Sequence, residues 1–341
     1  MKVLIVANMY PTPQKPYFGT FVKACVDGYV SQGVETEVAA IRGGGVKAYL
    51  AFYLAVFFKC LMGKYDFVHV HYVTHSVPPV YLASLFKRFK VLLNFHGSDA
   101  FPESYESNFR RKIKRKICQL ALKKSYGVIV PSKYFKEKLA ASYDVRNIIV
   151  SPSGGVDKLL FKFKAASGRT VLFAGRMIEE KGPLRAAQAI KDNINSIDRI
   201  IMVGEGPEVP RVKAILKGLD VEYYGMLPRA ELAAKMTEAD LFLFPSTREG
   251  ESLGLVLVEA IFSGCIPIAV LNGAVTEILT NTEGVKFAAR ADEFSVCVGK
   301  VLEEVESFPV YSDKLYRSVE NKYSFDQVAK NLVEKVGKIK S

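Results

Sequence analysis

The stretch Ala239–Val270, ADLFLFPSTREGESLGLVLVEAIFSGCIPIAV, holds two short apolar runs separated by a loop and a longer apolar segment. The runs Leu241–Phe244 and Ile266–Val270 do not alternate polar and apolar residues, which is typical of parallel strands buried on both faces. Parallel strands need a crossover connection, and we expect a helix that begins near Ser252 to supply it. The stretch therefore predicts a strand–helix–strand unit.

The same rhythm continues along all 341 residues, so we predict an α/β protein with two doubly wound, Rossmann-like units. At roughly 150 residues per domain, the length also fits two domains. A polar stretch without periodicity near 161–168 marks the boundary, with domains at 1–163 and 164–322 and a final helix at 323–341. The predicted strands are Lys2–Ala7, Glu35–Ile41, Phe67–His71, Val91–Phe95, Gly127–Pro131, Asn147–Ser151, Thr170–Ala174, Arg199–Val203, Val221–Tyr224, Leu241–Phe244, Ile266–Val270 and Val285–Phe287.

The composition is that of a globular protein and excludes disordered and fibrous chains, because 49% of the residues are apolar and 24% charged. The longest apolar run, Ala48–Phe58, is shorter than the ~20 residues of a membrane span, and the first residues lack the features of a signal peptide. The five cysteines are widely spaced and form no CxxC pair, which fits a reducing compartment. We therefore expect a cytoplasmic protein.

Positive charge is concentrated in the first half of the chain. The net charge is +12, but residues 1–165 carry +15 and residues 166–341 carry −3. Ser107–Lys136 contains ten basic residues and no acidic one. Within it, segment 110–124 predicts a helix with a cationic outer face. The predicted apolar inner face consists of Ile113, Ile117, Leu120 and Ala121.

Three interpretations of segment 110–124 remain open: a solvated surface helix, contact with an anionic membrane surface, and contact with nucleic acid. No nucleic-acid motif or aromatic platform accompanies the basic residues, so we expect no nucleic-acid partner. Each basic residue near an anionic membrane contributes about 1 kcal/mol to binding. We therefore expect this segment to bind an anionic membrane surface.

Two such units that face each other leave a cleft, and open parallel sheets bind ligands beyond the carboxyl ends of their strands. The pair Gly175-Arg176 directly follows a predicted strand, and Lys181 lies five residues after Arg176. The guanidinium fork and the ammonium point charge suit a pyrophosphate. The alternative is a pair of ordinary surface cations on a loop.

A second motif lies in the loop and helix after Phe244. The first amides of the predicted helix, from Ser252 to Gly254, would be unpaired and would form an anion site. A continuous helix would separate Glu251 and Glu259 by roughly 10–12 Å along its axis. Glu259 lies in an apolar run, where a carboxylate needs a hydrogen-bond partner. That partner is either a ligand diol or a backbone group.

The first half offers weaker signals. His96 directly follows a predicted strand, so it either contacts a ligand hydroxyl or has a structural role. Gly19 lies in a loop rich in Pro and Gly, where a glycine lets the backbone approach a phosphate. Only G-x-G occurs at Gly204–Gly206, so we expect no nicotinamide cofactor. His69, His71 and His75 invite a metal interpretation, but we expect strand-end packing and no metal site.

Together, these motifs resemble the retaining glycosyltransferases of the family-4 type, which have the GT-B fold. The resemblance covers nearly the whole chain, and the Glu-x7-Glu motif is its strongest part. The matching stretches are KVLIVANMYP, FGTFV, DFVHVHY, NFHGSDA, VIVPSKYFKEKL, PSGGVDKLLF, VLFAGRMIEEKG, IIMVGEGPE, YYGMLPRAELAAKMTEADLFLFPS and EGESLGLVLVEAIFSGCIPIAV.

The resemblance implies a role for each second-half motif. Arg176 and Lys181 would hold the donor diphosphate and stabilise the leaving group. Glu251 would bind hydroxyls of the donor sugar, and Glu259 those of the ribose. The amides of Leu253 and Gly254 would meet the phosphates or the sugar.

The first domain would contribute two further residues, His96 at the donor sugar and Gly19 at the diphosphate. The nucleobase would lie near Gly204–Gly206 and Met226, and the final helix would cross back to the first domain. Leu253 stands where the family often has Phe, and Gly19-Thr20 replaces a common Gly-Gly pair.

The implied activity is transfer of a sugar, with retention of configuration, from a nucleotide-diphosphate sugar to a saccharide or lipid-linked acceptor. Such a reaction would serve cell-envelope polysaccharide synthesis and would need neither a metal nor a cofactor. The protein would act at the inner face of the cytoplasmic membrane. A non-catalytic nucleotide- or glycan-binding scaffold and a nucleotide-sugar epimerase are the alternatives.

Overall fold

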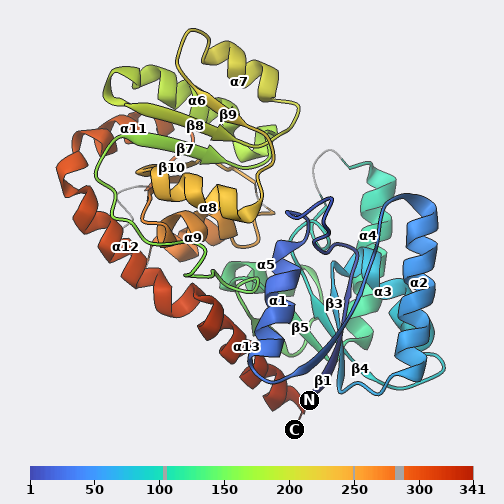
Figure 1. Ribbon diagram of the computed structural model, residues 1–341. Helices are drawn as coiled ribbons and strands as arrows, with labels where there is room; N and C mark the ends of the chain where they lie inside the picture. Colours follow the sequence, from blue (N-terminus) through green and yellow to red (C-terminus); the bar gives the residue numbers. More distant parts are fainter. Residues whose placement is uncertain (103–105, 249, 281–287, 341) are drawn as a thin grey trace. The chain divides into compact units, whose positions relative to one another are not determined.

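A computed structural model describes residues 1–102, 106–248, 250–280 and 288–340. The chain divides into two compact units (Figure 1): unit 1 comprises Met1–Gly155 and Phe325–Ser341, and unit 2 comprises Val156–Ser324. The division lies eight residues before the predicted boundary at 163/164. Val156 belongs to unit 2 because its amide donates to the Tyr323 carbonyl (2.8 Å) and its side chain is fully buried in that core.

Unit 1 contains six parallel strands in the order β2-β1-β3-β4-β5-β6. The side chains of the central strands are almost all buried, as expected for a sheet covered on both faces. All six predicted strands of this half are confirmed within two residues at each end. The strands are β1 Lys2–Ala7, β2 Glu35–Ala40, β3 Phe67–His71, β4 Lys90–Asn94, β5 Gly127–Val130 and β6 Ile148–Val150.

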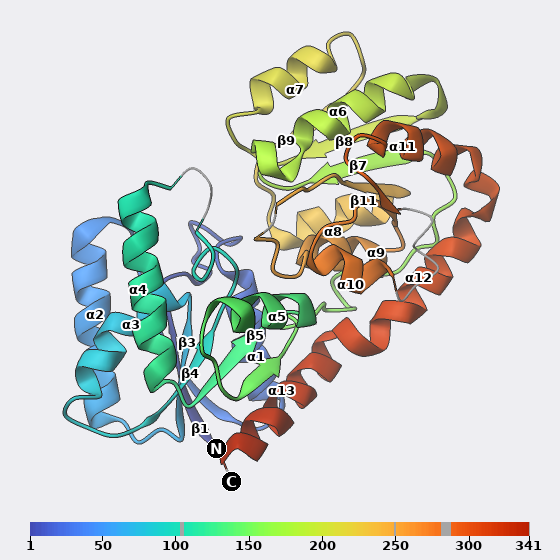
Figure 2. The same ribbon diagram turned by 180° about the vertical axis from the view of Figure 1, so that it is seen from behind.

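Helices cover both faces of this sheet, and Figure 2 shows them from behind. α1 (Thr20–Ser31) and α13 (Phe325–Lys340) bury their apolar residues in one core, on one face. The residues of the final helix thus group with those of the first domain. The helices on the other face are α2 Gly45–Met62, α3 Val73–Ala83, α4 Asn108–Lys124 and α5 Lys133–Ser142.

Unit 2 contains a second parallel sheet, in the order β12-β11-β10-β7-β8-β9. Five of its predicted strands are confirmed, and the sixth, Val285–Phe287, lies outside the described residues. The elements are β7 Thr170–Ala174, η1 Glu179–Lys181, α6 Pro183–Asp192, η2 Ile194–Ser196, β8 Arg199–Val203, α7 Val209–Ile215, β9 Glu222–Tyr224, α8 Arg229–Glu238, β10 Leu241–Phe244, α9 Leu255–Phe262, β11 Ile266–Val270, α10 Ala274–Leu279, β12 Ala288–Ala289, α11 Phe294–Glu303, η4 Val305–Ser307 and α12 Phe308–Tyr323.

Two helix predictions were wrong in detail. α9 begins at Leu255 and not near Ser252, because Gly254 adopts a left-handed conformation (φ 80°) that interrupts a helix. In α4, the predicted inner-face residues Ile113 and Leu120 are 43% and 53% exposed. The buried face is formed by Cys118, Ala121 and Leu122, with Ile117 half-buried.

One described helix, α2, is long and apolar enough to cross a membrane by length and composition alone. Most such helices in globular proteins are core helices, but only 17% of the residues of α2 are buried. Its connection argues against a span, since α2 links β2 and β3, which both pair with β1 in one sheet.

Candidate functional site

Lys181 reaches its position through a tight turn at the carboxyl end of β7. The residue ends the short helix η1, and Gly182 follows it in a left-handed conformation (φ 70°). A Cβ atom at Gly182 would lie 2.4 Å from the carbonyl oxygen of Pro245. The glycine therefore lets this turn pack directly against the loop after β10, which carries Glu251.

The side chains of Lys181 and Glu251 form an ion pair and are only 14% and 10% exposed. The Ser246 hydroxyl donates to the same carboxylate at 3.5 Å. Burial alone would raise the pKa of Glu251, but Lys181, Arg248 and Arg176 together hold it below its usual value. Glu251 is therefore ionised and lies among three cations.

Arg248 was missed by the sequence analysis, although it stands three residues before Glu251 in the decisive stretch. It lies close enough to Glu251 to lower the pKa of that carboxyl group. A third cation beside Arg176 and Lys181 could have been suspected from this spacing, because all three follow carboxyl ends of neighbouring strands, β7 and β10.

The N-terminus of α9 lies in the same segment. Gly254 is the N-cap residue, and its carbonyl accepts the Leu257 amide at 2.9 Å. The amides of the first helical turn therefore begin at Leu255 and not, as predicted, at Ser252. The Leu253 side chain is only 2% exposed and packs in the core of unit 2. Only the backbone of Leu253 is thus suited to ligand contact.

Glu259 lies further along α9 and is only 3% exposed. Its carboxylate pairs with the Arg229 guanidinium at 2.6 Å, a partner that the sequence did not indicate. Burial raises the pKa of Glu259, and Arg229 opposes this rise without cancelling it. Arg229 is the first residue of α8 and stands 30 positions before Glu259 in the sequence. No local sequence pattern predicts this ion pair, because it depends on the tertiary structure.

In unit 1, His96 lies two residues after the end of β4, in a turn organised by Asp99. The buried Asp99 carboxylate accepts the amides of His96 and Gly97, both at 3.0 Å, and of Ala100 at 3.2 Å. Burial raises the pKa of Asp99 to about 6 despite these bonds. The turn that carries His96 is therefore fixed by three backbone amides that converge on one carboxyl group.

His96 is held from the side by His71. The His71 Nδ1 and His96 Nε2 atoms lie 3.0 Å apart, and the two rings are stacked with centroids 5.2 Å apart. The ring of Phe21, in the first turn of α1, packs against His96 at 4.6 Å. Burial lowers the pKa of His96 to about 3, so its imidazole is neutral at physiological pH.

Gly19 lies two residues before Phe21, at the N-cap of α1, so unit 1 brings it near His96. Its left-handed conformation (φ 73°) favours glycine. A Cβ atom here would also lie 2.8 Å from the Met9 carbonyl, which leaves no space for a side chain. Gly19 and His96 belong to unit 1, whereas the other six predicted site residues belong to unit 2.

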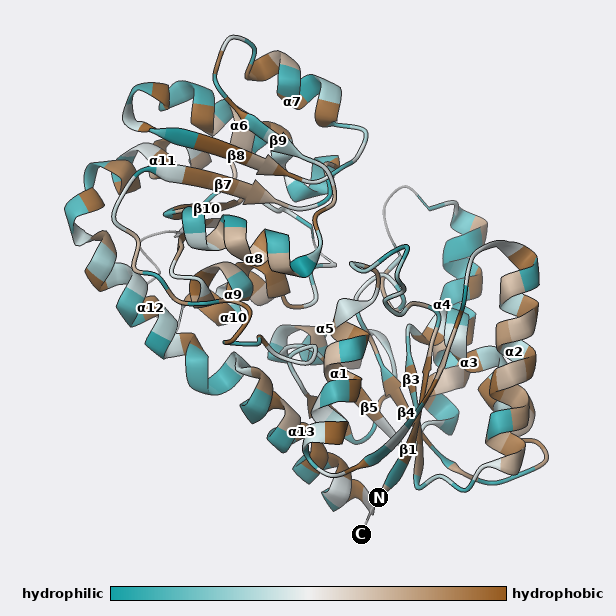
Figure 3. Ribbon diagram, viewed as in Figure 1, coloured by the Kyte–Doolittle hydropathy of each residue, from teal (hydrophilic) through white to brown (hydrophobic). Residues whose placement is uncertain are grey.

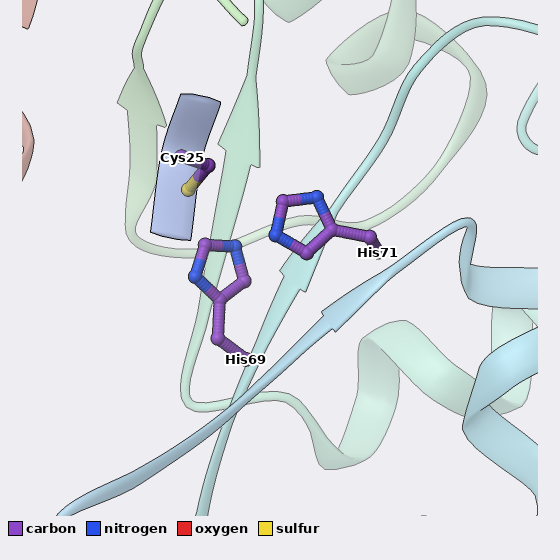
Figure 4. A group of neighbouring side chains, drawn as sticks. All are labelled: Cys25, His69 and His71. Atoms are coloured by element: carbon purple, nitrogen blue, oxygen red, sulfur yellow. The ribbon is translucent and has the colours of Figure 1, made fainter. Parts of the chain in front are cut away.

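Cys25, His69 and His71 form a buried group that could hold a metal by residue type (Figure 4). Their donor atoms lie within 4.8 Å of one another, and the two Nε2 atoms have no hydrogen-bond partner within the described residues. Stacking of His69 on His71 (4.4 Å) and a contact from the Tyr29 hydroxyl to His69 Nδ1 (3.2 Å) account for the ring positions. Burial raises the pKa of the Cys25 thiol to about 12, so a metal would have to displace its proton.

A pocket of about 220 Å³ lies beside the carboxyl end of β8. Gly204 and Gly206 make close backbone contacts there, since added Cβ atoms would lie 1.9 and 2.3 Å from the carbonyls of Gly175 and Met177. The lining residues include Met177, Gly204, Glu205, Lys213, Tyr223 and Tyr224. The pocket thus adjoins the loop that carries Arg176.

Comparison with known proteins agrees with this arrangement. Residues 4–157 match the family described as "Glycosyltransferase Family 4", and residues 168–304 match "Glycosyl transferases group 1". Among curated proteins, the chain is 21% identical to TuaC of Bacillus subtilis, a glycosyltransferase assigned to teichuronic acid biosynthesis, over 97% of both chains. It is 28% identical to the sulfoquinovosyl transferase of Arabidopsis thaliana, over 51% of this chain but only 36% of that enzyme.

Solved structures show the same fold. Sucrose-phosphate synthase from Thermosynechococcus elongatus superposes with a TM-score of 0.82 at 16% identity, over 99% of this chain and 98% of that one. HepE of Anabaena, solved with UDP and glucose, superposes with a TM-score of 0.77 at 16% identity, over 99% and 100%. The predicted GT-B fold is confirmed, and the chain belongs to the family-4, group 1 glycosyltransferases.

Proposed function

We propose that the protein transfers a sugar from a nucleotide-diphosphate sugar to a saccharide acceptor, with retention of configuration and without a metal ion. The observation that carries the proposal is the cluster of Lys181, Arg176 and Arg248 around the ionised Glu251. In a member of this family, three cations beside the first amides of α9 are suited to a diphosphate.

The cations would act mainly on the leaving group. As the bond between the anomeric carbon and the phosphate oxygen breaks, negative charge grows on the departing diphosphate. Arg176, Lys181 and Arg248 would stabilise that charge, which is the role that a bound metal has in other transferases. The acceptor hydroxyl would form the new bond on the same face of the sugar and give its proton to a phosphate oxygen.

The two carboxylates of α9 and its preceding loop would orient the donor. Glu251 would accept hydrogen bonds from hydroxyls of the sugar while Lys181 holds its charge in place. Arg229 contacts one oxygen of Glu259. We propose that Glu259 accepts the ribose hydroxyls while this pair keeps the carboxylate oriented, and that the base enters the pocket beside Gly204.

The proposed contribution of unit 1 is made by His96 and Gly19. A neutral imidazole can accept or donate a hydrogen bond without adding charge, which suits contact with a sugar hydroxyl. His71 would fix the orientation of His96 through the bond between Nδ1 and Nε2, and so acts as a positioning residue. Gly19 would let the backbone at the start of α1 approach the diphosphate.

For the acceptor, we propose a lipid-linked saccharide used in cell-envelope polysaccharide synthesis. The relative TuaC, assigned to teichuronic acid biosynthesis, and the basic segment 110–124 support this choice. The protein would then work in the cytoplasm, peripherally at the inner face of the cytoplasmic membrane.

Thermal unfolding with UDP, GDP, ADP and NAD, without added metal, tests the donor site. A ligand at 100 times its dissociation constant adds about 2.7 kcal/mol to the free energy of unfolding. We expect stabilisation by one nucleoside diphosphate, lost in Glu259→Gln and kept in Glu320→Gln, a control that breaks the ion pair with Lys158. Because HepE was solved with UDP and with UDP-glucose, UDP is the first nucleotide to test.

Three outcomes would contradict the proposal. No stabilisation by any nucleotide would mean that the cluster is not a donor site. Nucleotide binding without turnover of any nucleotide sugar would indicate a scaffold. Interconversion of a nucleotide sugar without an acceptor would indicate an epimerase, and product analysis by mass spectrometry and NMR separates these cases.

A further inference from the structure

α2 exposes a ridge of large apolar side chains. Val46, Leu50, Leu54, Phe58 and Met62 recur every fourth residue and are 50–77% exposed. The opposite side of the helix packs on the sheet of unit 1, where its buried residues join the core. A helix that is apolar on both its core side and its solvent side is unusual for a surface helix, whose outer face is normally polar.

The ridge continues onto the end of α3. Leu82, Leu85 and Phe86 are 53–71% exposed. The rings of Phe57 in α2 and Phe86, three residues after the end of α3, lie 6.0 Å apart, edge to face. They connect α2 to the segment that follows α3. Figures 1 and 2 both show α2, α3 and α4 side by side at this end of unit 1. Exposed apolar patches of this kind mark interaction surfaces.

α4 adds positive charge next to this ridge. Its C-terminal end packs on α3, since the Tyr81 hydroxyl donates to the Ala121 carbonyl and Lys124 lies over the Tyr81 ring at 5.8 Å. Figure 3 shows the contrast between the apolar α2 and the hydrophilic first turns of α4. Together, α2, α3 and α4 contain ten Lys and Arg residues and no Asp or Glu. Two of the ten, Lys59 and Lys114, form ion pairs with Glu37 and Glu106 from neighbouring segments.

The basic helix also exposes apolar side chains of its own. Phe109, Ile113 and Leu120 are 43–73% exposed and alternate with Arg110, Lys112, Arg115, Lys116, Lys123 and Lys124, which are exposed as well. Neither a solvated surface helix nor a helix that binds a membrane by charge alone requires exposed apolar side chains. Cationic and large apolar side chains that share one exposed surface are typical of helices at a lipid–water interface.

We infer that α2, the end of α3 and α4 form a membrane-docking face, called here the α2–α4 face, in which the α2 ridge enters the interface of an anionic lipid bilayer. The inference rests on the proposed membrane partner and deepens it, because the basic segment alone would bind by charge, whereas the ridge adds an apolar anchor. α2 lies in the plane of the interface, since the sheet holds its other side and prevents it from spanning.

Charge favours a bilayer over a second copy of the chain. An isologous dimer through the α2–α4 face would bring the exposed cations of α4 in one copy (Arg110, Lys112, Arg115, Lys116, Lys123 and Lys124) close to those of the other. Lipid headgroups such as phosphatidylglycerol supply the opposite charge, and the acyl chains take up the apolar ridge. Membrane binding then has an electrostatic contribution from the cations and a hydrophobic contribution from the ridge. Salt separates the two, because it screens only the electrostatic contribution.

The test measures cosedimentation of the full chain with vesicles at low and high salt, without donor or acceptor. On phosphatidylcholine–phosphatidylglycerol vesicles we expect binding that salt weakens but does not abolish. Leu50→Gln with Leu54→Gln removes two exposed side chains at little cost to the helix and should lower the salt-resistant part about 10²-fold. Arg115→Gln with Lys116→Gln should lower only the low-salt part, by about tenfold or more.

Val296→Gln with Val310→Gln is the matched control, because it removes two similarly exposed apolar residues from unit 2. It should bind vesicles like the unchanged chain. Binding that high salt abolishes and that the α2 variant leaves unchanged would overturn the inference. So would a concentration-dependent dimer, seen by light scattering and lost in the α2 variant. UDP binding measured on the same variants keeps this result separate from the donor-site proposal.

Discussion

The two units share one architecture but place different polar groups at the carboxyl ends of their strands. Each is a six-stranded parallel sheet in the described structure. Unit 1 contains 26 Lys and Arg against 11 Asp and Glu, a net of +15, and unit 2 contains 21 against 24, a net of −3. Yet the strand ends of the cationic unit carry neutral, stacked imidazoles, whereas those of unit 2 carry buried ion pairs.

The difference shows that net charge and site charge are separate properties. Unit 1 carries its excess charge on surface helices such as α4, and its buried histidines lose their charge because burial lowers their pKa. Unit 2 keeps ionised groups at low exposure, which requires partners such as Lys181 for Glu251 and Arg229 for Glu259.

The largest effect is expected from acid. His69, His71 and His96 have a folded-state pKa far below 6.5, so the unfolded chain binds more protons below that pH. Each contributes stability that is present above pH 6.5 and is lost as the pH falls, by up to about 1.4 kcal/mol per pH unit. Asp99 has a raised folded-state pKa of about 6, so between about pH 6 and 4 its protonation stabilises the folded chain as the pH falls. This gain offsets the loss from one of the three histidines. The net loss is then about 3 kcal/mol per pH unit.

Hydrogen exchange of peptides from each unit, corrected for the intrinsic rate, measures this effect. Between pH 6.5 and 5, peptides of β3 and β4 should lose protection before those of β7 and β8. His69→Asn removes one titrating group and should lower the net acid dependence by about half, from about 3 to about 1.4 kcal/mol per pH unit. Equal loss of protection in both units would contradict the contrast between neutral and ionised strand ends.

Removal of Arg229 is expected to have the next largest effect. Arg229→Gln leaves Glu259 buried without its cation, which costs about 3 kcal/mol. The pKa of Glu259, already raised by burial, should rise further. A group with a raised folded-state pKa loses its contribution as the pH rises, so the variant should be less destabilised at pH 5 than at pH 8.

Urea unfolding at both pH values checks this result. The double variant Arg229→Gln with Glu259→Gln removes the unpaired charge and should regain most of the lost stability. Arg317→Gln, which breaks an exposed pair with Asp313, is the control and should change the free energy of unfolding by less than about 1 kcal/mol. If the double variant is as unstable as the single one, the Arg229 contact has another role than charge compensation.

A change at Lys181 is expected to act on turnover. Lys181→Ala should lower kcat about 10²-fold or more, equivalent to about 2.7 kcal/mol, if the cation stabilises the leaving diphosphate. Lys191→Ala removes an exposed lysine of α6 and should leave kcat unchanged. Initial rates of nucleotide release from the donor measure both. Unchanged kcat in Lys181→Ala and in Arg176→Ala would exclude the proposed mechanism.

Local sequence patterns predicted the sheets well because buried parallel strands are continuous apolar runs. Eleven predicted strands lie in the described residues, and all of them are present. The Lys181–Glu251 pair joins two residues that were chosen separately, each by its place after a strand. Arg229 and the exposed ridge of α2 could not be found this way. The role of Arg229 depends on a tertiary contact. The ridge is an apolar stripe, and the sequence of such a stripe does not show whether it faces a core or solvent.

The smallest effect concerns the two glycines that cap helices in the two candidate site regions. Gly19 and Gly254 both have left-handed φ angles, which cost an alanine about 1–2 kcal/mol. A Cβ at Gly19 would also press on the Met9 backbone at 2.8 Å, whereas at Gly254 it would meet Phe244 at an ordinary 3.6 Å. Gly19→Ala should therefore destabilise its unit by about 1 kcal/mol more than Gly254→Ala.

Gly33→Ala is the control. Gly33 has a left-handed φ of 72°, and no atom lies within 4 Å of the position that a Cβ would take, so this variant measures the backbone cost alone. Equal loss in Gly19→Ala and Gly33→Ala, measured by urea unfolding, would mean that the Met9 segment moves freely, and a rigid approach of this backbone to a diphosphate would then lose its support.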